Sequence, residues 1–230
     1  MTRGSLRIDN LTALRYSLSY EPVLAEQFGR NRIFVELAAV GERVLEFGCA
    51  DGFISRHLTE SGCRVTAVEV DPEAAERARQ WCEQVLVHDL NRLDWTQQLR
   101  GKFDTVLCGD VLEHLVDPDV TLNQIPALLT PSGRVIISLP NIAHIRTRLK
   151  LFFGKFEYES TGIMDVTHLR FYTQKAAREL IESAGFRINL YQPLVGGSVL
   201  TRWLRIALHK LFARGMMFVA VPLAPPEDRL

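Results

Sequence analysis

RVLEFGCADG, residues 43–52, is the stretch that decides the fold expected for this chain. Its first half, 43–47, is mostly apolar and typical of a short buried strand. The five residues from 48 to 52 are small or turn-forming, and FISRHLTESG follows them at helical spacing. A strand, a glycine-containing turn and a helix N-terminus in this order let a ligand approach the backbone closely.

Two common phosphate-binding patterns do not fit this turn. A P-loop is excluded because no Gly-Lys-Ser/Thr follows, and the dinucleotide-binding pattern fails because Phe53 occupies the position of its third glycine. The second strand, VTAVEVD at 65–71, brings Glu69 to the place where a strand-end carboxylate receives ribose hydroxyls. Asp71 is predicted to cap the next helix, since Pro72 stands at its first position. Taken alone, the turn is equally compatible with an ordinary strand-to-helix connection that binds no ligand.

Strands and helices continue to alternate along the chain. Apolar strand candidates at 84–90, 103–110 and 134–141 each end in polar residues, and helical patterns separate them. This βα alternation predicts an α/β fold with a doubly wound, mostly parallel sheet. Ligands of such sheets bind at the carboxyl ends of the strands, which is where the polar residues lie.

Three motifs make the chain resemble the class I S-adenosylmethionine-dependent methyltransferases. They are E-x-G-x-x-x-G at 46–52 with the acid of the second strand, GDVLEHL at 109–115, and the L-x-P-x-G pattern at 129–133. The resemblance implies a seven-stranded Rossmann-like sheet with an antiparallel last strand. It also implies S-adenosyl-L-methionine as cofactor, with S-adenosyl-L-homocysteine as product. The implied cofactor-binding residues are Glu46, Gly48, Cys49, Ala50, Asp51, Gly52, Glu69, Val70, Asp89, Leu90, Asp110 and Val111.

Two of these residues carry a qualification. Ala50 stands where the family most often has glycine, and because alanine resists a positive φ, we expect the turn to differ locally. Asp89 would face the adenine amino group, and capping of the segment 91–95 is the alternative.

Residues 141–172 interrupt the alternation and are predicted to form a lid over the cofactor, inserted after the fifth strand. They begin with an apolar and basic helix at 142–153. The segment resembles a bacterial subgroup of the same family that has the series PN-x-x-H, G-x-F-x-Y and D-x-T-H-L-R-F-[FY]-T. This resemblance implies substrate-binding roles for Asn141, His144, Tyr158, Asp165 and Arg170. The alternative is structural, with Asp165 shaping a turn and Arg170 ion-paired.

Methyl transfer to an alcohol requires a base, and two histidines are candidates. His168 is predicted first and His114 second, because an unperturbed imidazole has a pKa near the working pH. Each is alternatively a packed, hydrogen-bonded histidine. The chain lacks an Asp-Pro-Pro-Tyr motif of the amide-methylating kind, so we expect a hydroxyl of a sugar, glycan precursor or related metabolite as acceptor. The alternatives are a non-catalytic scaffold and an oxidoreductase that binds NAD or a nucleotide sugar, which Phe53 disfavours.

Composition narrows the classes of partner. The formal net charge of +0 argues against general nucleic-acid binding. Residues 1–140 carry 14 Lys/Arg and 20 Asp/Glu, whereas residues 141–230 carry 13 and 7. This asymmetry suits a cationic cofactor and an anionic substrate, or is incidental. The 4 cysteines include no CxxC pair, so no metal site and no disulfides are predicted. Without a transmembrane-length apolar run or a signal-peptide core, a cytoplasmic protein is expected.

A single domain over residues 1–230 is expected. Its outer parts would be a helix at 20–39 and a hairpin at 186–222 that encloses a basic amphipathic helix at 199–214. For this basic helix, packing against the sheet or a partner subunit is favoured over contact with an anionic membrane. The sequence does not indicate the oligomeric state.

Overall fold

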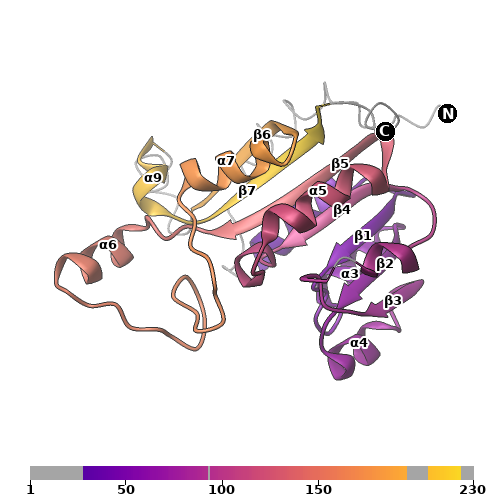
Figure 1. Cartoon of the computed structure of the whole chain (residues 1–230), viewed down its shortest axis with the longest axis horizontal. Coiled ribbons are helices and arrows are strands. Elements are labelled where there is room, and N and C mark those ends of the chain that lie inside the picture. The colour runs from indigo at the N-terminus through magenta and orange to yellow at the C-terminus, as the bar shows by residue number, and fades with distance from the viewer. Residues whose placement is uncertain (1–27, 93, 196–206, 224–230) are drawn as a thin grey trace.

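The computed structural model describes residues 28–92, 94–195 and 207–223. Its centre is a 7-stranded sheet with the order β3-β2-β1-β4-β5-β7-β6 (Figure 1). The strands are β1 Arg43–Phe47, β2 Arg64–Glu69, β3 Gln84–Val87, β4 Phe103–Gly109, β5 Leu129–Pro140, β6 Phe186–Val195 and β7 Ala213–Pro222. β1 to β5 are parallel, and β7 lies antiparallel between β5 and β6. The predicted doubly wound, mostly parallel sheet with an antiparallel last strand is confirmed.

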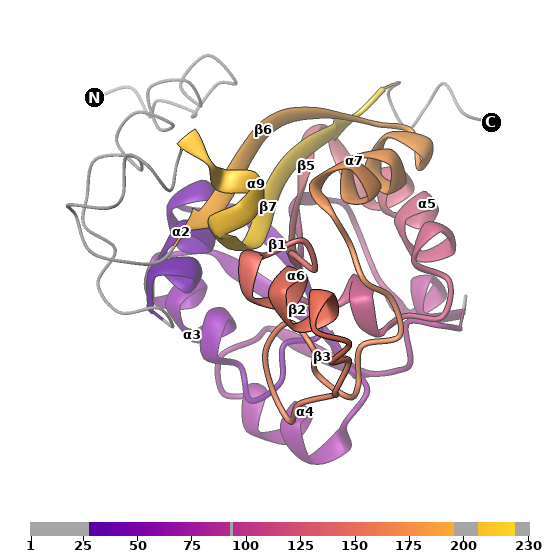
Figure 2. The ribbon, with the colours of Figure 1, turned by 90° about the vertical axis from the view of Figure 1, so that its left-hand side faces the viewer.

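Helices cover both faces of the sheet. Their bounds are α2 Phe28–Leu37, α3 Phe53–Glu60, α4 Pro72–Ala78, η1 Asp94–Gln98, η2 Leu112–His114, α5 Pro118–Leu128, α6 Ile145–Phe152, α7 Gln174–Ser183 and α9 His209–Phe212. α2 and α3 lie on one side of the sheet, and α5 and α7 lie on the other (Figure 2). Along β1, Val44 packs with the α2 and α3 side, whereas Leu45 and Phe47 pack with the α5 and α7 side. The strand is apolar on both faces because both are buried.

Helix ends follow the sequence signals closely. The Asp71 side chain accepts a hydrogen bond from the Glu73 backbone N–H at 2.9 Å, so Asp71 caps α4 as predicted. At α7, Thr173 Oγ1 accepts from the Ala176 N–H at 3.2 Å, and Gly185 follows the helix with a φ of 78°. These local signals fix where the helices leave the sheet, and therefore where the connecting loops lie.

One predicted turn lies inside a strand. The segment 130–133 was expected to lead into the fifth strand, but β5 already starts at Leu129. Leu129 pairs with Phe103 and Arg134 pairs with Thr105, so the four residues between them form a bulge opposite a single residue of β4. Proline has no backbone N–H to donate to the ladder, and glycine weakens a strand and often marks a bulge, which explains the irregularity here.

The C-terminal prediction needs a correction. Residues 199–206 of the expected helix at 199–214 lie outside the described residues, as do residues 20–27 of the expected helix at 20–39. The described part contains only α9, and β7 begins at Ala213. The last residues of the expected helix are therefore strand, because β7 must stay extended to pair with β5 on one side and β6 on the other. Among the described helices, none has the length and apolar character needed to cross a membrane.

The amino end of the sheet is joined by a charged contact. Arg134 donates to both carboxylate oxygens of Glu42 at 3.0 Å, and each of these side chains is 14% exposed. Thr105 Oγ1 donates to the same carboxylate at 2.9 Å, and Arg134 also donates to the Leu37 carbonyl oxygen. β4, β5 and the segment before β1 are thus fixed together at the end of the sheet away from the strand carboxyl termini.

Candidate functional site

The turn between β1 and α3 has space for glycine and for little else. Gly48 has a φ of 64°, and a Cβ built on it would lie 2.7 Å from Val111 Cγ2. Gly52 has a φ of 80°, and its Cβ would meet Ala78 and Trp81 at 3.0–3.1 Å. A side chain at either position would be strained by the backbone and by its neighbours. The two glycines predicted from the sequence therefore let the turn pack closely against Val111, Ala78 and Trp81.

Ala50, between these glycines, adopts the left-handed conformation with a φ of 47°. We expected alanine to alter the turn because it resists a positive φ. Instead the alanine accepts the strained conformation, at a cost of about 1–2 kcal/mol. Its backbone N–H donates to Glu69 Oε2 at 2.8 Å, which holds the turn in this shape.

The Glu69 carboxylate lies at the end of β2, as predicted, and is 7% exposed. Besides the Ala50 N–H, it accepts hydrogen bonds through Oε1 from the backbone N–H groups of Val70 at 2.8 Å and Asp71 at 3.0 Å. A carboxylate offers roughly four lone-pair positions, so one position at Oε2 remains for a further donor. Val70 itself has an exposed side chain (63%).

Glu46 is a second buried carboxyl close to this turn. It is 2% exposed and accepts a hydrogen bond from Ser55 Oγ at 2.5 Å. Burial raises the pKa of Glu46 to about 7, the Ser55 hydrogen bond opposes the shift, and the negative charge of Glu69 adds to it. Beside it, burial raises the pKa of the Cys49 thiol, which therefore stays neutral. With a pKa of about 7, Glu46 is partly protonated at neutral pH, and a positive charge bound nearby would favour its ionised form.

The residues predicted after β3 shape a turn. Asp89 Oδ1 accepts hydrogen bonds from both the backbone N–H and the Nδ2 of Asn91, each at 2.9 Å, and Leu90 is buried. This is the local role that the sequence left open for Asp89. Asn91 Oδ1 in turn accepts from the Val116 N–H at 2.8 Å, which connects this turn to the loop after β4. By contrast, Asp51 lies at the surface, ion-paired with Arg77.

The end of β4 is strained and hydrogen-bonded. Asp110 has a φ of 52°, and its Oδ1 accepts from Ser138 Oγ at 2.5 Å. Ser138, on β5, is fully buried and was not identified from the sequence, although the SLPN pattern contains it. Val111 follows, nearly buried, against the space next to Gly48.

The insertion at 141–172 is docked on the loop after β4. The backbone N–H groups of Leu169 and Arg170 both donate to the Glu113 carbonyl oxygen, at 2.8 and 3.1 Å. The Arg170 guanidinium donates to the Val116 carbonyl oxygen and contacts Asp117 at 3.3 Å. Arg170 is thus ion-paired, which is the structural alternative that the sequence left open.

Other residues predicted to bind substrate also have local roles. Asn141 is 2% exposed, and its Nδ2 donates to the Ala213 carbonyl oxygen at 2.9 Å. His144 caps α6, with Nδ1 accepting from the Arg146 N–H at 3.2 Å. These two side chains fix the start of the insertion against the end of the sheet.

Farther along the insertion, Asp165 accepts from the backbone N–H and the hydroxyl of Thr167, and these hydrogen bonds lower the pKa of the Asp165 carboxyl. Tyr158 differs from the others because it is 53% exposed, with its ring centroid 5.7 Å from that of Phe156. It is therefore the predicted substrate residue that remains most accessible.

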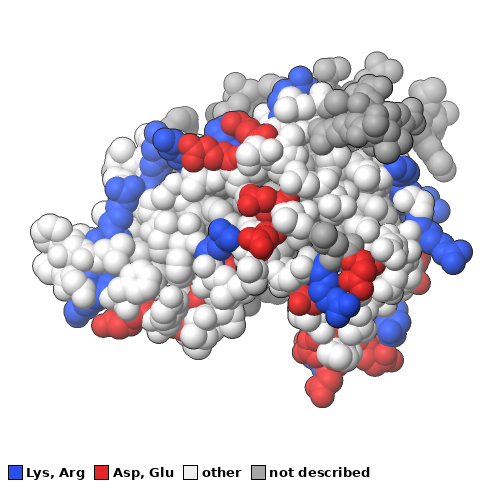
Figure 3. Space-filling view, viewed as in Figure 1, with Lys and Arg blue, Asp and Glu red and all other residues white. Residues whose placement is uncertain are grey.

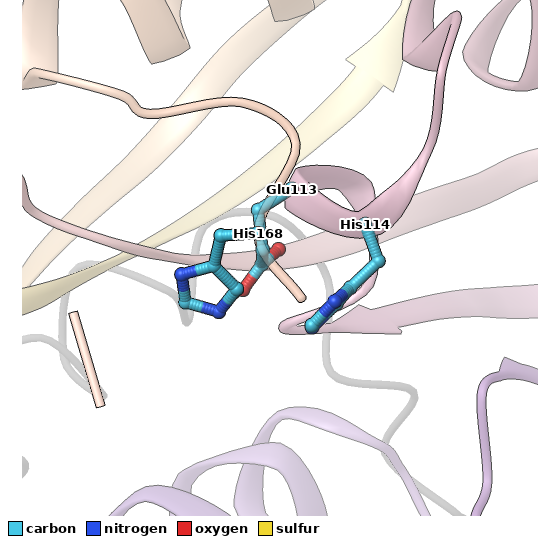
Figure 4. A group of neighbouring side chains, drawn as sticks. All are labelled: Glu113, His114 and His168. Carbon is cyan, nitrogen blue, oxygen red and sulfur yellow. The ribbon is translucent and has the colours of Figure 1, made fainter. Parts of the chain in front are cut away.

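Three residues that the sequence treated separately come together. Glu113 and His114 end η2, His168 lies in the insertion, and one potential ligand atom from each falls within 4.8 Å of the others. Figure 4 shows Glu113, His114 and His168 pointing toward one another from these two segments. Glu113 is fully buried and His168 is 8% exposed, and Glu113 Oε1 lies 4.0 Å from His168 Nε2. From the sequence, Glu113 belonged to the GDVLEHL motif on the ligand side of the sheet, with an ordinary turn residue as the alternative, and it was assigned no site role.

The outer surface of the insertion is basic and apolar. Lys and Arg side chains gather over α6 and α9 on the face in Figure 3. α6 contributes Arg146, Arg148 and Lys150, of which Lys150 pairs with Glu159. Next to them, Phe152 and Phe153 are 81% and 70% exposed. The insertion therefore offers both cations and apolar surface.

The chain is similar to known methyltransferases. The model of a family described as "Methyltransferase domain" matches residues 23–190. The ubiquinone biosynthesis O-methyltransferase of Xanthomonas euvesicatoria pv. vesicatoria is 33% identical over 113 residues, which cover 47% of each chain. That of Haemophilus ducreyi is 34% identical over 110 residues, covering 44% of this chain and 46% of the relative. The chain thus spans about half the length of the curated relatives it matches.

Solved structures share the fold at low sequence identity. A SAM-dependent methyltransferase from Archaeoglobus fulgidus superimposes with a TM-score of 0.65 at 17% identity, covering 85% of this chain and 94% of its own. The magnesium protoporphyrin IX methyltransferase of Synechocystis, solved with bound SAH, gives a TM-score of 0.58 at 18% identity, covering 93% and 96%. At such identities the similarity concerns the fold alone.

Proposed function

The chain belongs to the methyltransferase domain family, and from this we propose that it transfers a methyl group from S-adenosyl-L-methionine to an oxygen atom of a small molecule. The observation that carries the proposal is the pair formed by the Gly48 turn and Glu69 at the ends of two neighbouring parallel strands. Ligands of doubly wound sheets bind at this edge.

The residues at this edge fit the cofactor chemically. S-adenosyl-L-methionine supplies a methyl group on a sulfonium, and S-adenosyl-L-homocysteine is the product. The turn around Gly48 lies at the carboxyl end of β1, where a ligand would meet the backbone, and the remaining position at Glu69 Oε2 accepts one ribose hydroxyl. No lone-pair position of this carboxylate then remains for the second ribose hydroxyl. Glu46, neutral when buried alone, ionises more readily beside a positive charge.

An oxygen acceptor is favoured by the relatives, which are named O-methyltransferases. Their names refer to ubiquinone biosynthesis and give no support to the sugar or glycan acceptor expected from the sequence. The exposed aromatic residues of the insertion, among them Phe156 and Tyr158, suit an acceptor with an apolar part. The basic residues of α6 suit an anionic group on the same molecule.

Loss of the acceptor proton is assigned to the cluster formed by Glu113, His114 and His168. This cluster follows the carboxyl end of β4 and is covered by the insertion, so an acceptor held under the insertion would meet it. The insertion would also exclude water from the reacting atoms, which raises the strength of charge interactions there.

Two binding experiments test the cofactor assignment. Calorimetric titration should give saturable binding of S-adenosyl-L-methionine and S-adenosyl-L-homocysteine, and none of NAD at the same concentrations. Glu69→Ala should weaken cofactor binding by at least about 10-fold, since a ribose hydroxyl loses its acceptor and the turn loses a hydrogen bond. Glu73→Ala, an exposed acid on α4, serves as the matched control and should bind normally. A preference for NAD would refute the proposal.

The reaction is tested by release of S-adenosyl-L-homocysteine with a panel of phenols, sugars and amines. Turnover with a hydroxyl compound is the expected result. Cofactor binding without turnover for any acceptor would instead favour the scaffold alternative, and turnover with amines alone would refute the oxygen acceptor.

A further inference from the structure

We propose that Glu113, His114 and His168 form a binding site for a divalent transition-metal ion such as Zn²⁺. Two imidazoles and one carboxylate are a common ligand set for such an ion, and they leave positions open for an acceptor oxygen. The sequence alone predicted no metal site, because its cysteines include no CxxC pair. His168 lies more than fifty residues from the other two ligands, so local spacing does not indicate this set. The inference deepens the proposed function, since it assigns a means of removing the acceptor proton.

The hydrogen bonds of the two imidazoles define which ring nitrogens are available. His114 Nδ1 lies 3.1 Å from the Thr167 carbonyl oxygen, and His168 Nδ1 lies 3.2 Å from the Ile163 carbonyl oxygen. A carbonyl oxygen only accepts, so in both rings Nδ1 carries the hydrogen. In the neutral form of each ring the Nε2 lone pair is therefore available to a ligand.

This arrangement is typical of metal-binding histidines. A histidine that ligates a metal nearly always donates its other ring N–H to a carboxylate, a backbone carbonyl or water, which fixes its orientation. Here both histidines do so with backbone carbonyls of the same insertion. Two independent rings with the same tautomer, facing one carboxylate, favour a cation between them.

The distances between the side chains of this cluster also support a bound metal ion. Glu113 Oε1 and His168 Nε2 are 4.0 Å apart, which is too long for a direct hydrogen bond. Two ligand atoms that each lie about 2 Å from one ion are separated by roughly 3–4 Å. The imidazole rings of His114 and His168 have centroids 4.8 Å apart and meet edge to face. A small contraction around an ion would complete the site.

A cation here would act on both structure and chemistry. It would join η2 to the insertion, where backbone hydrogen bonds to the Glu113 carbonyl already hold Leu169 and Arg170. It would also bind the acceptor hydroxyl and lower its pKa, so that the hydroxyl loses its proton to solvent as it binds, before the insertion excludes water and the oxygen attacks the methyl group. The sulfonium carbon–sulfur bond then breaks as the oxygen–carbon bond forms, and the neutral thioether departs.

The test uses the full chain, freed of metal with a chelator and titrated with Co²⁺. We expect saturable visible absorption typical of nitrogen and oxygen ligands, with one ion per chain, and displacement of the Co²⁺ by Zn²⁺. Glu113→Gln and His168→Ala should each weaken Co²⁺ binding by about 100-fold or more, since each removes a ligand. The matched control is His57→Ala, because His57 is a partly exposed histidine of α3, outside the proposed site, and its loss should leave Co²⁺ binding unchanged.

A second measurement does not depend on the folding of the variants. Paramagnetic broadening by Co²⁺ in wild-type NMR spectra should centre on residues 112–114 and 163–170. Absence of saturable binding, equal affinity in the ligand variants, or broadening centred elsewhere would overturn the inference. Because metal binding is measured without cofactor or turnover, its failure is distinct from a failure of S-adenosyl-L-methionine binding, which would count against the proposed function instead.

Discussion

Glu69 accepts a hydrogen bond at 2.8 Å from the backbone N–H of Ala50, a residue in the left-handed conformation. The contact connects the end of β2 to the turn after β1, where the cofactor is proposed to bind. It also explains how an alanine is kept at a position that glycine would occupy without strain.

Ala50→Gly should therefore stabilise the protein. Glycine removes the cost of a left-handed alanine but adds entropy to the unfolded chain, so the net gain should be about 0.5–1 kcal/mol in the free energy of unfolding. Urea denaturation measures it. Ala177→Gly, inside the helix α7, is the control and should change stability in the opposite direction. A loss of stability in Ala50→Gly would mean that the turn is held in another conformation.

Gly48→Ala should impair both folding stability and cofactor binding. The new Cβ would lie 2.7 Å from Val111 Cγ2, and the positive φ adds strain, so we expect a loss of about 2–4 kcal/mol. Gly154→Ala is a matched control, since Gly154 has a φ of 71° but nothing within 4 Å of its Cβ position. The control should lose only about 1 kcal/mol. The double variant Gly48→Ala/Val111→Ala should recover part of the difference, and equal losses in the two single variants would contradict the steric explanation.

Glu46 should make the stability depend on pH. Its pKa is raised from 4.5 in the unfolded chain to about 7 in the fold, so between these values the folded state binds the proton more tightly. The free energy of unfolding should therefore fall as the pH rises from about 4.5 to 7, by about 3 kcal/mol for this group. Denaturation curves of Glu46→Gln, which stays neutral, should lack this part of the pH dependence. Parallel curves for wild type and variant would show that Glu46 ionises normally.

Arg134→Met should destabilise the amino end of the sheet. The change leaves the Glu42 carboxylate largely buried without its cation, which should cost about 2–4 kcal/mol in the free energy of unfolding. Lys175→Met removes a cation from an exposed pair with Glu179 on α7 and should leave stability within measurement error. The double variant Glu42→Gln/Arg134→Met should be more stable than Arg134→Met alone. If it is not, the loss arises from packing of the arginine side chain rather than from the charge.

Local patterns in the sequence predicted those parts of the structure that depend on neighbouring residues. The Gly48–Gly52 turn, the cap at Asp71 and the alternation of strands and helices up to β5 follow from spacing and turn chemistry. Asp165 likewise shapes its own turn, an alternative that the sequence already offered. Such features need no information about distant parts of the chain.

The features that the sequence did not predict depend on contacts between residues far apart in the chain. His168 was predicted as a base from its motif, but its proximity to Glu113 arises only when the insertion docks on η2. The bulge at 130–133 depends on the register between β4 and β5, which no local pattern specifies. Arg170 carries a charge that suits an anionic substrate, yet its partners are Val116 and Asp117, far away in sequence.

The place of β7 between β5 and β6 has a consequence for synthesis on the ribosome. β5 and β6 emerge before β7, yet they cannot pair with each other, because β7 occupies the position between them. Until β7 has emerged, β5 presents a bare edge of unpaired N–H and C=O groups to other nascent chains, which is a hazard for aggregation. A chain stopped before Ala213 would keep that edge permanently, so the parallel half of the sheet would depend on chaperones to stay in solution.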